Sequence, residues 1–372
     1  MLKASLIVIF LFFIFSCTQK KENQSSKQVL ELGTILENPK NNDAVFSDIR
    51  YVRLETLADN LLGDNLYFHT GQNKLYILDR SHQKALLTFN SEGKYLGKTG
   101  KQGNGPEEYT NTIDFVVRGD TIDFLSAGAQ QFIYSYLYNG QFIKKTNIKF
   151  YAGSFQLVDD KFYAISTNWN KSLHDHQIYL LNKNGEEVKK MHPNNTSLDM
   201  SIGENCFTSL GEKVYYFEPF NNKVYELDTD TLFPVYELDF GKYNIPEEFF
   251  KTDVMKGFEL INKQGFSMIR NVFINRENIV FEIVRQKEGQ AGNLYLITFN
   301  KKSGEIKHLT LTEDNFIFRY PIGLNDKNEM MYLVFPMGDV NQEFKKFGLE
   351  PDISSFKESD NPLIVYCKMK NV

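Results

Sequence analysis

The sequence predicts an all-β fold, a six-bladed β-propeller with four antiparallel strands in each blade. Phe and Tyr, which favour half-buried pleated surfaces, account for 32 and 20 of the 372 residues. Apolar runs opened by a polar turn recur along the chain, beginning at Leu75, Ile122, Phe162, Val214, Ile279 and Met331. A four-stranded unit that repeats about every 40–50 residues is typical of a propeller.

The first unit shows how each blade is built. Leu66–Thr70 gives an inner strand, and Leu75–Asp79 follows it after a tight turn. Ala85–Asn90 and Lys94–Gly97 complete the unit and are separated by the turn Ser91–Gly93. Gly, Asp and Asn dominate these turns because they adopt or cap the backbone conformations that turns require. The same two-turn pattern in the later units predicts four strands in each.

The sixth unit lacks a fourth strand of its own, because the chain ends soon after Leu363–Lys368. Ile49–Glu55 is a spare β-like run near the start of the domain. We expect it to supply the outer strand of the sixth blade and so to close the ring, which removes exposed edges. A two-sheet sandwich or a stack of β domains is the competing architecture, and the regular two-turn pattern favours the propeller.

The first 17 residues form a targeting segment. Its apolar run, Ala4–Phe15, is too short to span a bilayer comfortably. Ser16 then precedes Cys17, as in a bacterial lipoprotein signal peptide, so we expect a lipidated Cys17 that anchors the protein to the membrane. An ordinary signal peptide with an incidental cysteine is the alternative. Residues 18–28 are expected to form a flexible tether and residues 29–372 the propeller.

Cys206 and Cys367 are the two remaining cysteines, and an even pair in an exported protein suggests a disulfide. The repeat pattern places Cys206 in the inner strand of blade four and Cys367 in the third strand of blade six, with a whole blade between them. A disulfide needs Cα atoms within about 7 Å. We therefore expect two free, buried thiols.

Two stretches are similar to motifs of a known family. Phe46–Thr56 (FSDIRYVRLET) resembles the strand that opens the domain of six-bladed β-propeller lipoproteins of bacterial envelopes. Gly103–Tyr109 (GNGPEEY) resembles the G-x-G-P-G-E-Y signature of that family, with Glu107 in place of its last glycine. The resemblance implies a propeller over roughly residues 30–370. It adds little about function, because most members have no established biochemical role.

Antiparallel geometry divides the connections of a propeller between two faces. Turns between strands one and two, and between strands three and four, share one face and are short here; we name it the short-turn face. Loops between strands two and three share the other face with the crossings between blades. These vary widely in length, and Thr167–His176, Tyr243–Lys263 and about Pro336–Pro362 are the long ones. Varied loops on a rigid scaffold are where binding usually occurs, so we expect function on this variable-loop face.

The crossing Tyr243–Lys263 is predicted to be a helix. Pro246 suits a first-turn position, and Phe250, Val254, Phe258 and Ile261 fall on one apolar face. We expect this helix to pack over the end of the ring, and a helix that binds a membrane or a partner is the alternative. A further short helix is expected near Glu343–Phe347.

Four candidate ligand-binding residues come from blade one and the crossing that follows it. Arg80 and His82 lie in the loop between its second and third strands, and Glu108 and Tyr109 end the glycine-rich crossing that begins at Gly100. This crossing lacks the Lys-Ser/Thr of a phosphate-binding loop. We interpret it as a turn whose last two residues can also hold neighbouring blades together by hydrogen bonds.

The loop Thr167–His176 supplies the other candidates, Trp169, His174 and His176. An exposed indole with polar neighbours could stack on a sugar ring, whereas a buried indole would anchor the loop. On a strand, His174 and His176 would share a face and could ligate one metal, but no third ligand is evident, and a solvated loop is favoured.

The charge balance, 42 basic and 47 acidic side chains for a net −5, argues against a nucleic-acid partner. The sequence contains no nucleophile elbow, zinc-protease or calcium-loop motif, and we expect no cofactor and no metal. We expect a lipoprotein of the bacterial envelope, on the outer membrane or periplasmic side. Its predicted function is non-catalytic binding or scaffolding through the variable-loop face, with an envelope protein or a glycan as partner. The oligomeric state is left open.

The alternative function is that of a propeller hydrolase or lyase acting on a carbohydrate or another small molecule. Such an enzyme would cluster acidic, basic or imidazole side chains at one end of the central channel. Ile113–Val117 and Val272–Ile274 make the innermost strands look mainly apolar, which disfavours this alternative.

Overall fold

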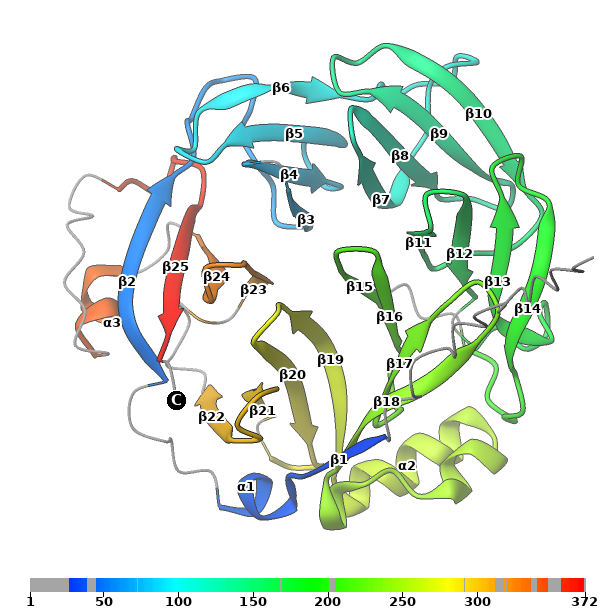
Figure 1. The fold of residues 1–372 in the computed structure, drawn as a ribbon, viewed down its shortest axis with the longest axis vertical. Coiled ribbons are helices and arrows are strands. Elements are labelled where there is room, and N and C mark those ends of the chain that lie inside the picture. The colour runs from blue at the N-terminus through cyan, green and yellow to red at the C-terminus, as the bar shows by residue number, and fades with distance from the viewer. Residues whose placement is uncertain are drawn as a thin grey trace, which may run out of the picture.

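The computed structural model describes residues 27–370, apart from 39–44, 72, 168, 201–204, 291, 312–317, 319, 336–339 and 347–355. The targeting segment, Cys17 and nearly all of the tether lie outside the described residues. Six sheets stand in a ring (Figure 1) around a central channel; each contains four antiparallel strands, and one sheet has a fifth strand that pairs in parallel. The predicted six-bladed propeller is confirmed.

Blades one to five are built from consecutive strands that run from the channel outwards. Blade one has β3 (Leu66–Gly71), β4 (Lys74–Asp79), β5 (Ala85–Asn90) and β6 (Tyr95–Thr99), and blade two has β7 (Thr112–Arg118), β8 (Thr121–Ser126), β9 (Gln131–Leu137) and β10 (Phe142–Ile148). Blade three has β11 (Ser154–Val158), β12 (Phe162–Ser166), β13 (His176–Asn182) and β14 (Glu187–Pro193). Blade four has β15 (Phe207–Leu210), β16 (Lys213–Phe217), β17 (Lys223–Leu227) and β18 (Leu232–Asp239), and blade five has β19 (Phe266–Ile274), β20 (Asn278–Gln286), β21 (Asn293–Asn300) and β22 (Ile306–Leu311).

Blade six joins the two ends of the domain. It contains β23 (Pro321–Leu324), β24 (Glu329–Val334), β25 (Leu363–Met369) and, on the outside, β2 (Phe46–Arg53). β2 runs antiparallel to β25, so the expected closure is confirmed, although the strand begins and ends slightly earlier than Ile49–Glu55. Arg50 fixes this closure through its Nε and Nη2, which donate to the two carboxylate oxygens of Glu329 at 3.0 and 2.8 Å.

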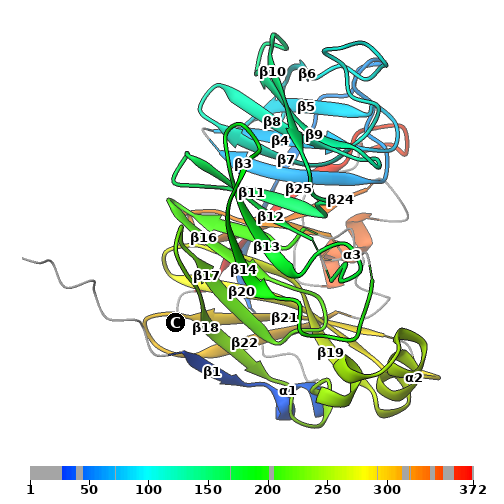
Figure 2. The same ribbon diagram turned by 90° about the vertical axis from the view of Figure 1, so that its right-hand side faces the viewer.

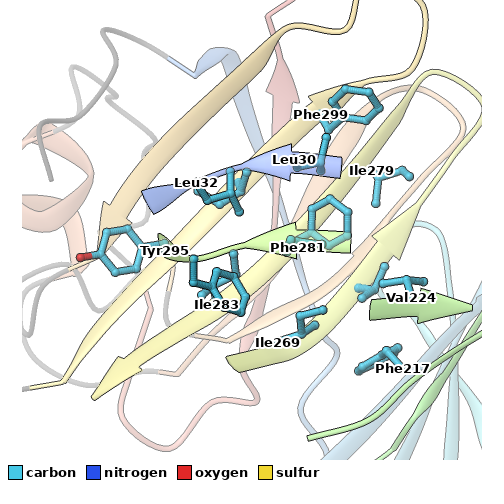
Figure 3. Packing of buried hydrophobic residues seen from close by; sticks show 14 of the residues in the cluster. Leu30, Leu32, Phe217, Val224, Ile269, Ile279, Phe281, Ile283, Tyr295 and Phe299 are labelled. Atoms are coloured by element: carbon cyan, nitrogen blue, oxygen red, sulfur yellow. The ribbon is translucent and has the colours of Figure 1, made fainter. Parts of the chain in front are cut away.

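One strand was not expected from the sequence. β1 (Gln28–Glu31) adds to the outer edge of blade four in parallel to β18, and helix α1 (Gly33–Glu37) follows it. Leu30 and Leu32 pack into the apolar cluster between blades four and five that also contains Phe281 and Tyr295 (Figure 3). Because Leu30 is the one buried residue of the strand, β1 leaves no periodic pattern in the sequence.

The predicted helix over Tyr243–Lys263 is interrupted. Two short 3₁₀ turns, η1 (Gly241–Tyr243) and η2 (Glu247–Lys251), precede α2 (Val254–Gln264). The break occurs because Asp253 caps the N-terminus of α2, where its side chain accepts the backbone N–H of Lys256 at 3.0 Å. Phe250 therefore lies in η2 rather than α2, yet it still joins Val254, Phe258 and Ile261 in one apolar cluster. Among the described residues, no helix is long and apolar enough to cross a membrane.

The connections divide between two faces as the antiparallel geometry requires. α2 lies in the crossing from blade four to blade five, and α3 (Val340–Lys346) lies between β24 and β25, near the short helix expected there. Figure 2 shows both helices on the same side of the ring, the variable-loop face. Cys206, which directly precedes β15, and Cys367 in β25 are buried and form no disulfide, as expected.

Candidate functional site

The glycine-rich crossing after blade one is a structural joint. Tyr109 is fully buried, and its hydroxyl donates to the backbone oxygen of Lys84 at 3.2 Å. Its ring packs against Phe124 of blade two at 5.4 Å between centroids, which ties that blade to blade one. Glu108 accepts the backbone N–H of Gly105 at 3.0 Å and pairs with Lys101, and these contacts lower the pKa of the Glu108 carboxyl.

Arg80 also connects the first two blades. Its guanidinium donates to the side chain of Asn65 and to the backbone oxygen of Ile113 in β7, and it lies 4.0 Å from the ring centroid of Tyr67. His82 is exposed in the next turn, where its backbone N–H is held by Asp79. Of these four candidates, His82 alone has an exposed side chain, and the other three make contacts within the first two blades and the crossing between them.

Trp169 is only 2% exposed, which makes the sugar-stacking interpretation wrong. The indole packs in the cluster beneath α2, where Phe250 lies at 5.5 Å between ring centroids. The physical reason is a hydrogen bond from Trp169 Nε1 to the buried carboxylate of Glu218 at 2.6 Å, which satisfies the indole N–H away from water. The alternative, a loop anchored by its indole, is what the structure contains.

Glu218 organises a buried polar network between blades three and four. Besides Trp169, its carboxylate contacts the Tyr216 hydroxyl at 3.2 Å, the Asn221 amide at 2.5 Å and His192 Nε2 at 3.1 Å. Burial alone would raise the pKa of Glu218, but His192, Trp169 and Asn221 favour the carboxylate and bring the pKa below its ordinary value. Sequence reasoning missed Glu218, since an isolated Glu after an apolar strand carries no motif.

Three residues around this network have left-handed backbones. Trp169, His192 and Phe220 have φ values of 57°, 58° and 61°, which are unfavourable for bulky side chains. Such conformations persist where the surroundings hold them firmly. The loop Thr167–His176 is therefore fixed to the ring at its Trp169 end.

His174 and His176 do not form a metal site. β13 begins only at His176, so the two imidazoles do not share a strand face as the spacing suggested. His174 Nε2 accepts the backbone N–H of Tyr151 at 3.1 Å, and burial lowers the pKa of this imidazole. His176 Nδ1 lies 3.1 Å from Asp175 Oδ1. In the described ranges, no group of three or more His, Cys, Asp or Glu side chains is placed to hold a metal ion.

The outer part of this loop forms an open groove on the variable-loop face. It is lined by residues 171–175 and by Asn194 and Asn195. The groove walls are fixed, because Lys171 donates to the backbone oxygen of Thr196 and Ser172 to the carboxylate of Asp199. Leu173 is 63% exposed beside it. We name these seven residues the loop groove.

Asn194 is the unusual residue of the loop groove. It is 5% exposed, and in the described structure neither atom of its side-chain amide has a hydrogen-bond partner. A buried amide without partners typically costs about 1–3 kcal/mol. An amide in this state is suited to pair with a ligand or an ordered water.

The central channel is the second candidate site. It has a volume of about 850 Å³ and runs from Leu66 and Pro321 at one end to Lys74 and Lys327 at the other. Its wall is more polar than the expected apolar inner strands, because His69, Asp114 and Arg270 contribute to it. The sequence pattern did not indicate these side chains, because a single polar residue does not change the apolar character of a strand.

Burial shifts the pKa values of Asp114 and His69 in the channel wall. Burial raises the pKa of Asp114 to about 7, although its carboxylate accepts the backbone N–H groups of Phe115 and Phe155 at 2.8 and 3.0 Å. Burial lowers the pKa of His69. The hydrogen bond to Phe155 joins blades two and three, so Asp114 has a structural role.

The candidates thus fall into two separate groups, one at the joint of blades one and two and one in the blade-three loop.

The fold resembles several solved structures. A "Putative exported protein" of Bacteroides fragilis has 16% identity and a TM-score of 0.74, with 92% of this chain and 99% of that one covered. BamB of Moraxella catarrhalis has 11% identity and a TM-score of 0.41, with 88% and 91% covered. A protein of unknown function from Bacteroides caccae has 11% identity and a TM-score of 0.39, with 66% and 93% covered.

No curated protein matches the chain. One family model does match, over residues 27–368, which span the whole ring from β1 to β25. The chain therefore belongs to the family described as Domain of unknown function (DUF4934).

Proposed function

We propose that this chain is a lipid-anchored protein of the bacterial envelope that binds a partner without catalysis through its variable-loop face. The anchor rests on the apolar run Ala4–Phe15 followed by Ser16 and Cys17. The Bacteroides fragilis protein of similar fold is described as exported, which agrees with this location.

The direction of β1 supports an orientation that exposes the variable-loop face. β18 starts at the short turn Asp228–Thr231 and ends at the crossing that carries α2. Because β1 is parallel to β18, the tether enters from the side of the short-turn face. The roughly ten residues after Cys17 reach at most about 36 Å when extended. A lipid on Cys17 would then keep the short-turn face nearer the membrane and direct the variable loops away from it.

The loop groove carries the proposal of binding. It combines fixed walls, the exposed Leu173 and the buried, unpartnered amide of Asn194. An exposed apolar side chain beside unsatisfied polar groups is typical of a recognition surface. An amide offers a donor and an acceptor together, which matches a peptide backbone of an envelope protein or the hydroxyl and acetamido groups of a glycan.

The hydrolase or lyase alternative would use the channel. Asp114, with a pKa of about 7, is the observation in its favour, since a carboxyl in that range can act as an acid or a base. Its carboxylate is already engaged by two backbone N–H groups, which favours the binding function.

A pull-down from detergent-solubilised envelopes tests the choice of face. The baits are the native chain, Leu173→Arg in the loop groove and Tyr138→Arg in a turn of the short-turn face, where Tyr138 is 51% exposed. Both substitutions add a charge at an exposed site and leave the core intact. We expect Leu173→Arg to lose partners that Tyr138→Arg retains. The opposite pattern would show that the short-turn face binds.

The anchor is tested separately by metabolic labelling with a radioactive fatty acid. The native chain should incorporate label and Cys17→Ala should not. Continued labelling of Cys17→Ala would exclude lipidation at Cys17, without bearing on the loop groove.

A further inference from the structure

A β-bulge in the innermost strand of blade five places a charged residue at the channel. In the pairing of β19 with β20, Ile269 lies opposite Ile283 and Asn271 lies opposite Glu282. Arg270 therefore has no residue opposite it in β20. A bulge redirects the extra side chain and interrupts the ladder. Similar shifts in β7 and β23 leave out Ile113 and Ile322, which are apolar. Among these three positions, Arg270 alone brings a charge to the channel.

The Arg270 side chain is held on one side and accessible on the other. Its Nη1 lies 3.5 Å from Oε1 of Glu282, a carboxylate that is completely buried and also accepts from the Asn271 amide. This contact with Glu282 uses one of the five N–H donors of the guanidinium. The side chain remains 45% exposed and lines the channel. Glu282 thus orients the guanidinium and leaves donors for another anion.

The neighbouring strands provide weaker polar groups. β19 lies between β15 and β23 in the ring (Figure 1). Thr208 and Ser209 of β15 line the channel with Asn271, and Gln156 lines it from blade three. Hydroxyl and amide groups of this kind complement the polar atoms of a ligand without adding charge.

The rest of the wall suits an organic molecule rather than an inorganic ion alone. Phe68, Phe273 and Tyr366 are partly exposed aromatic residues of the channel lining. The volume of about 850 Å³ lies in the range of small-molecule pockets, about 300–1,000 Å³, and far exceeds that of a bare anion. Arg50 also lines the channel, but both carboxylate oxygens of Glu329 accept from its guanidinium, so Arg270 is the better candidate for a ligand. An aromatic wall beside the guanidinium of Arg270 favours a ligand that carries both a carboxylate and a carbon skeleton.

We propose that the central channel binds a small organic carboxylate, whose charged group pairs with Arg270. A guanidinium recognises a carboxylate in a planar, two-bonded geometry, which a Lys ammonium cannot reproduce. This site is separate from the loop groove, so the channel could be occupied whether or not the variable-loop face binds a partner.

Isothermal titration calorimetry with two matched pairs of probes tests the proposal. D-glucuronate is compared with D-glucose, and benzoate with benzyl alcohol, on the full chain with Cys17→Ala. We expect at least one carboxylate to bind at least tenfold more tightly than its neutral counterpart. Arg270→Gln should weaken that binding at least tenfold, because Gln removes the charge and the two-bonded geometry.

Arg276→Gln is the matched control, because Arg276 lies exposed in the turn that follows β19 and the substitution removes the same charge from the same blade. Its binding should equal that of the native chain. Thr208→Val tests the site while leaving the Arg270–Glu282 pair intact, and it should weaken binding by a smaller factor. Circular dichroism checks that each variant is folded.

Four results would overturn the proposal. The first is that neither carboxylate binds, and the second is that the members of each pair bind equally. The third is that folded Arg270→Gln and Thr208→Val both bind as tightly as Arg276→Gln. Sulfate provides a last comparison: binding as tight as that of the preferred carboxylate would mean a general anion site and would contradict the organic ligand.

Discussion

Replacing Glu218 by Gln tests whether the buried network fixes the loop that carries the loop groove. The carboxylate contacts four groups, from Trp169, Tyr216, Asn221 and His192. A Gln side chain keeps one acceptor oxygen and presents an NH₂ group where the second oxygen stood. Each carboxylate oxygen faces one obligate donor, Trp169 Nε1 or Asn221 Nδ2, and one group that can also accept, so at least one of the four contacts is lost. A hydrogen bond to a charged group typically contributes about 1.5–3 kcal/mol. The expected loss in the free energy of unfolding is therefore at least about 1.5–3 kcal/mol.

Urea denaturation near neutral pH, followed by circular dichroism, measures this loss. Glu212→Gln is the control, because Glu212 is exposed in the turn between β15 and β16 and its removal should change stability by less than about 0.5 kcal/mol. A loss below about 1 kcal/mol in Glu218→Gln would refute the reasoning. It would mean that the network adds little to what the apolar cluster around Trp169 already provides.

The same residue gives a pH dependence with a defined sign. The pKa of Glu218 in the folded state lies below its ordinary value of 4.5. Its stabilisation is therefore fully present above about pH 4.5 and is lost as the pH falls through the lower folded-state pKa. The stability difference between the native chain and Glu218→Gln should stay constant near neutral pH and shrink in acid. A difference that grew in acid would contradict the assigned direction.

Two further predictions concern the ring. Arg50→Gln breaks the two-bonded contact with Glu329, so urea denaturation should show a loss of about 1–3 kcal/mol in the free energy of unfolding. The control Ser47→Ala, in the same strand, should leave the stability nearly unchanged. Equal stabilities of the two variants would mean that β2 is held by its backbone alone. In Cys17→Ala, a thiol reagent should find no fast-reacting group in the native state and two in urea, because Cys206 and Cys367 are buried and form no disulfide. A native-state reaction of either cysteine would show local opening of its blade.

The ring was predictable because its evidence is repetitive. Each blade repeats the same two turns, and the absence of one strand at the C-terminus is matched by a spare run near the N-terminus that became β2. The role of Tyr109 in joining two blades was also predictable, because it is an aromatic residue at the crossing between them. Local patterns therefore determined the architecture, with small shifts at the ends of strands.

The sites depend on contacts that a single sequence does not reveal. Trp169 is buried because a carboxylate 49 residues later in the chain accepts its N–H. Arg270 lines the channel because β19 and β20 pair with a bulge, and that register is set by the partner strand. The break before α2 was the one local feature open to prediction, since Asp253 is a favourable N-cap residue.

β1 also determines how the protein would bear mechanical load. A pull on the tether is transmitted along β1, and its parallel pairing with β18 means that the hydrogen bonds and the packing of Leu30 resist together, in shear. β2 comes later in the chain, beyond α1. Tension therefore reaches β2, the strand that closes the ring, only after β1 has detached from β18. The pairing of β1 with blade four would thus protect the closed ring from a pull on the tether.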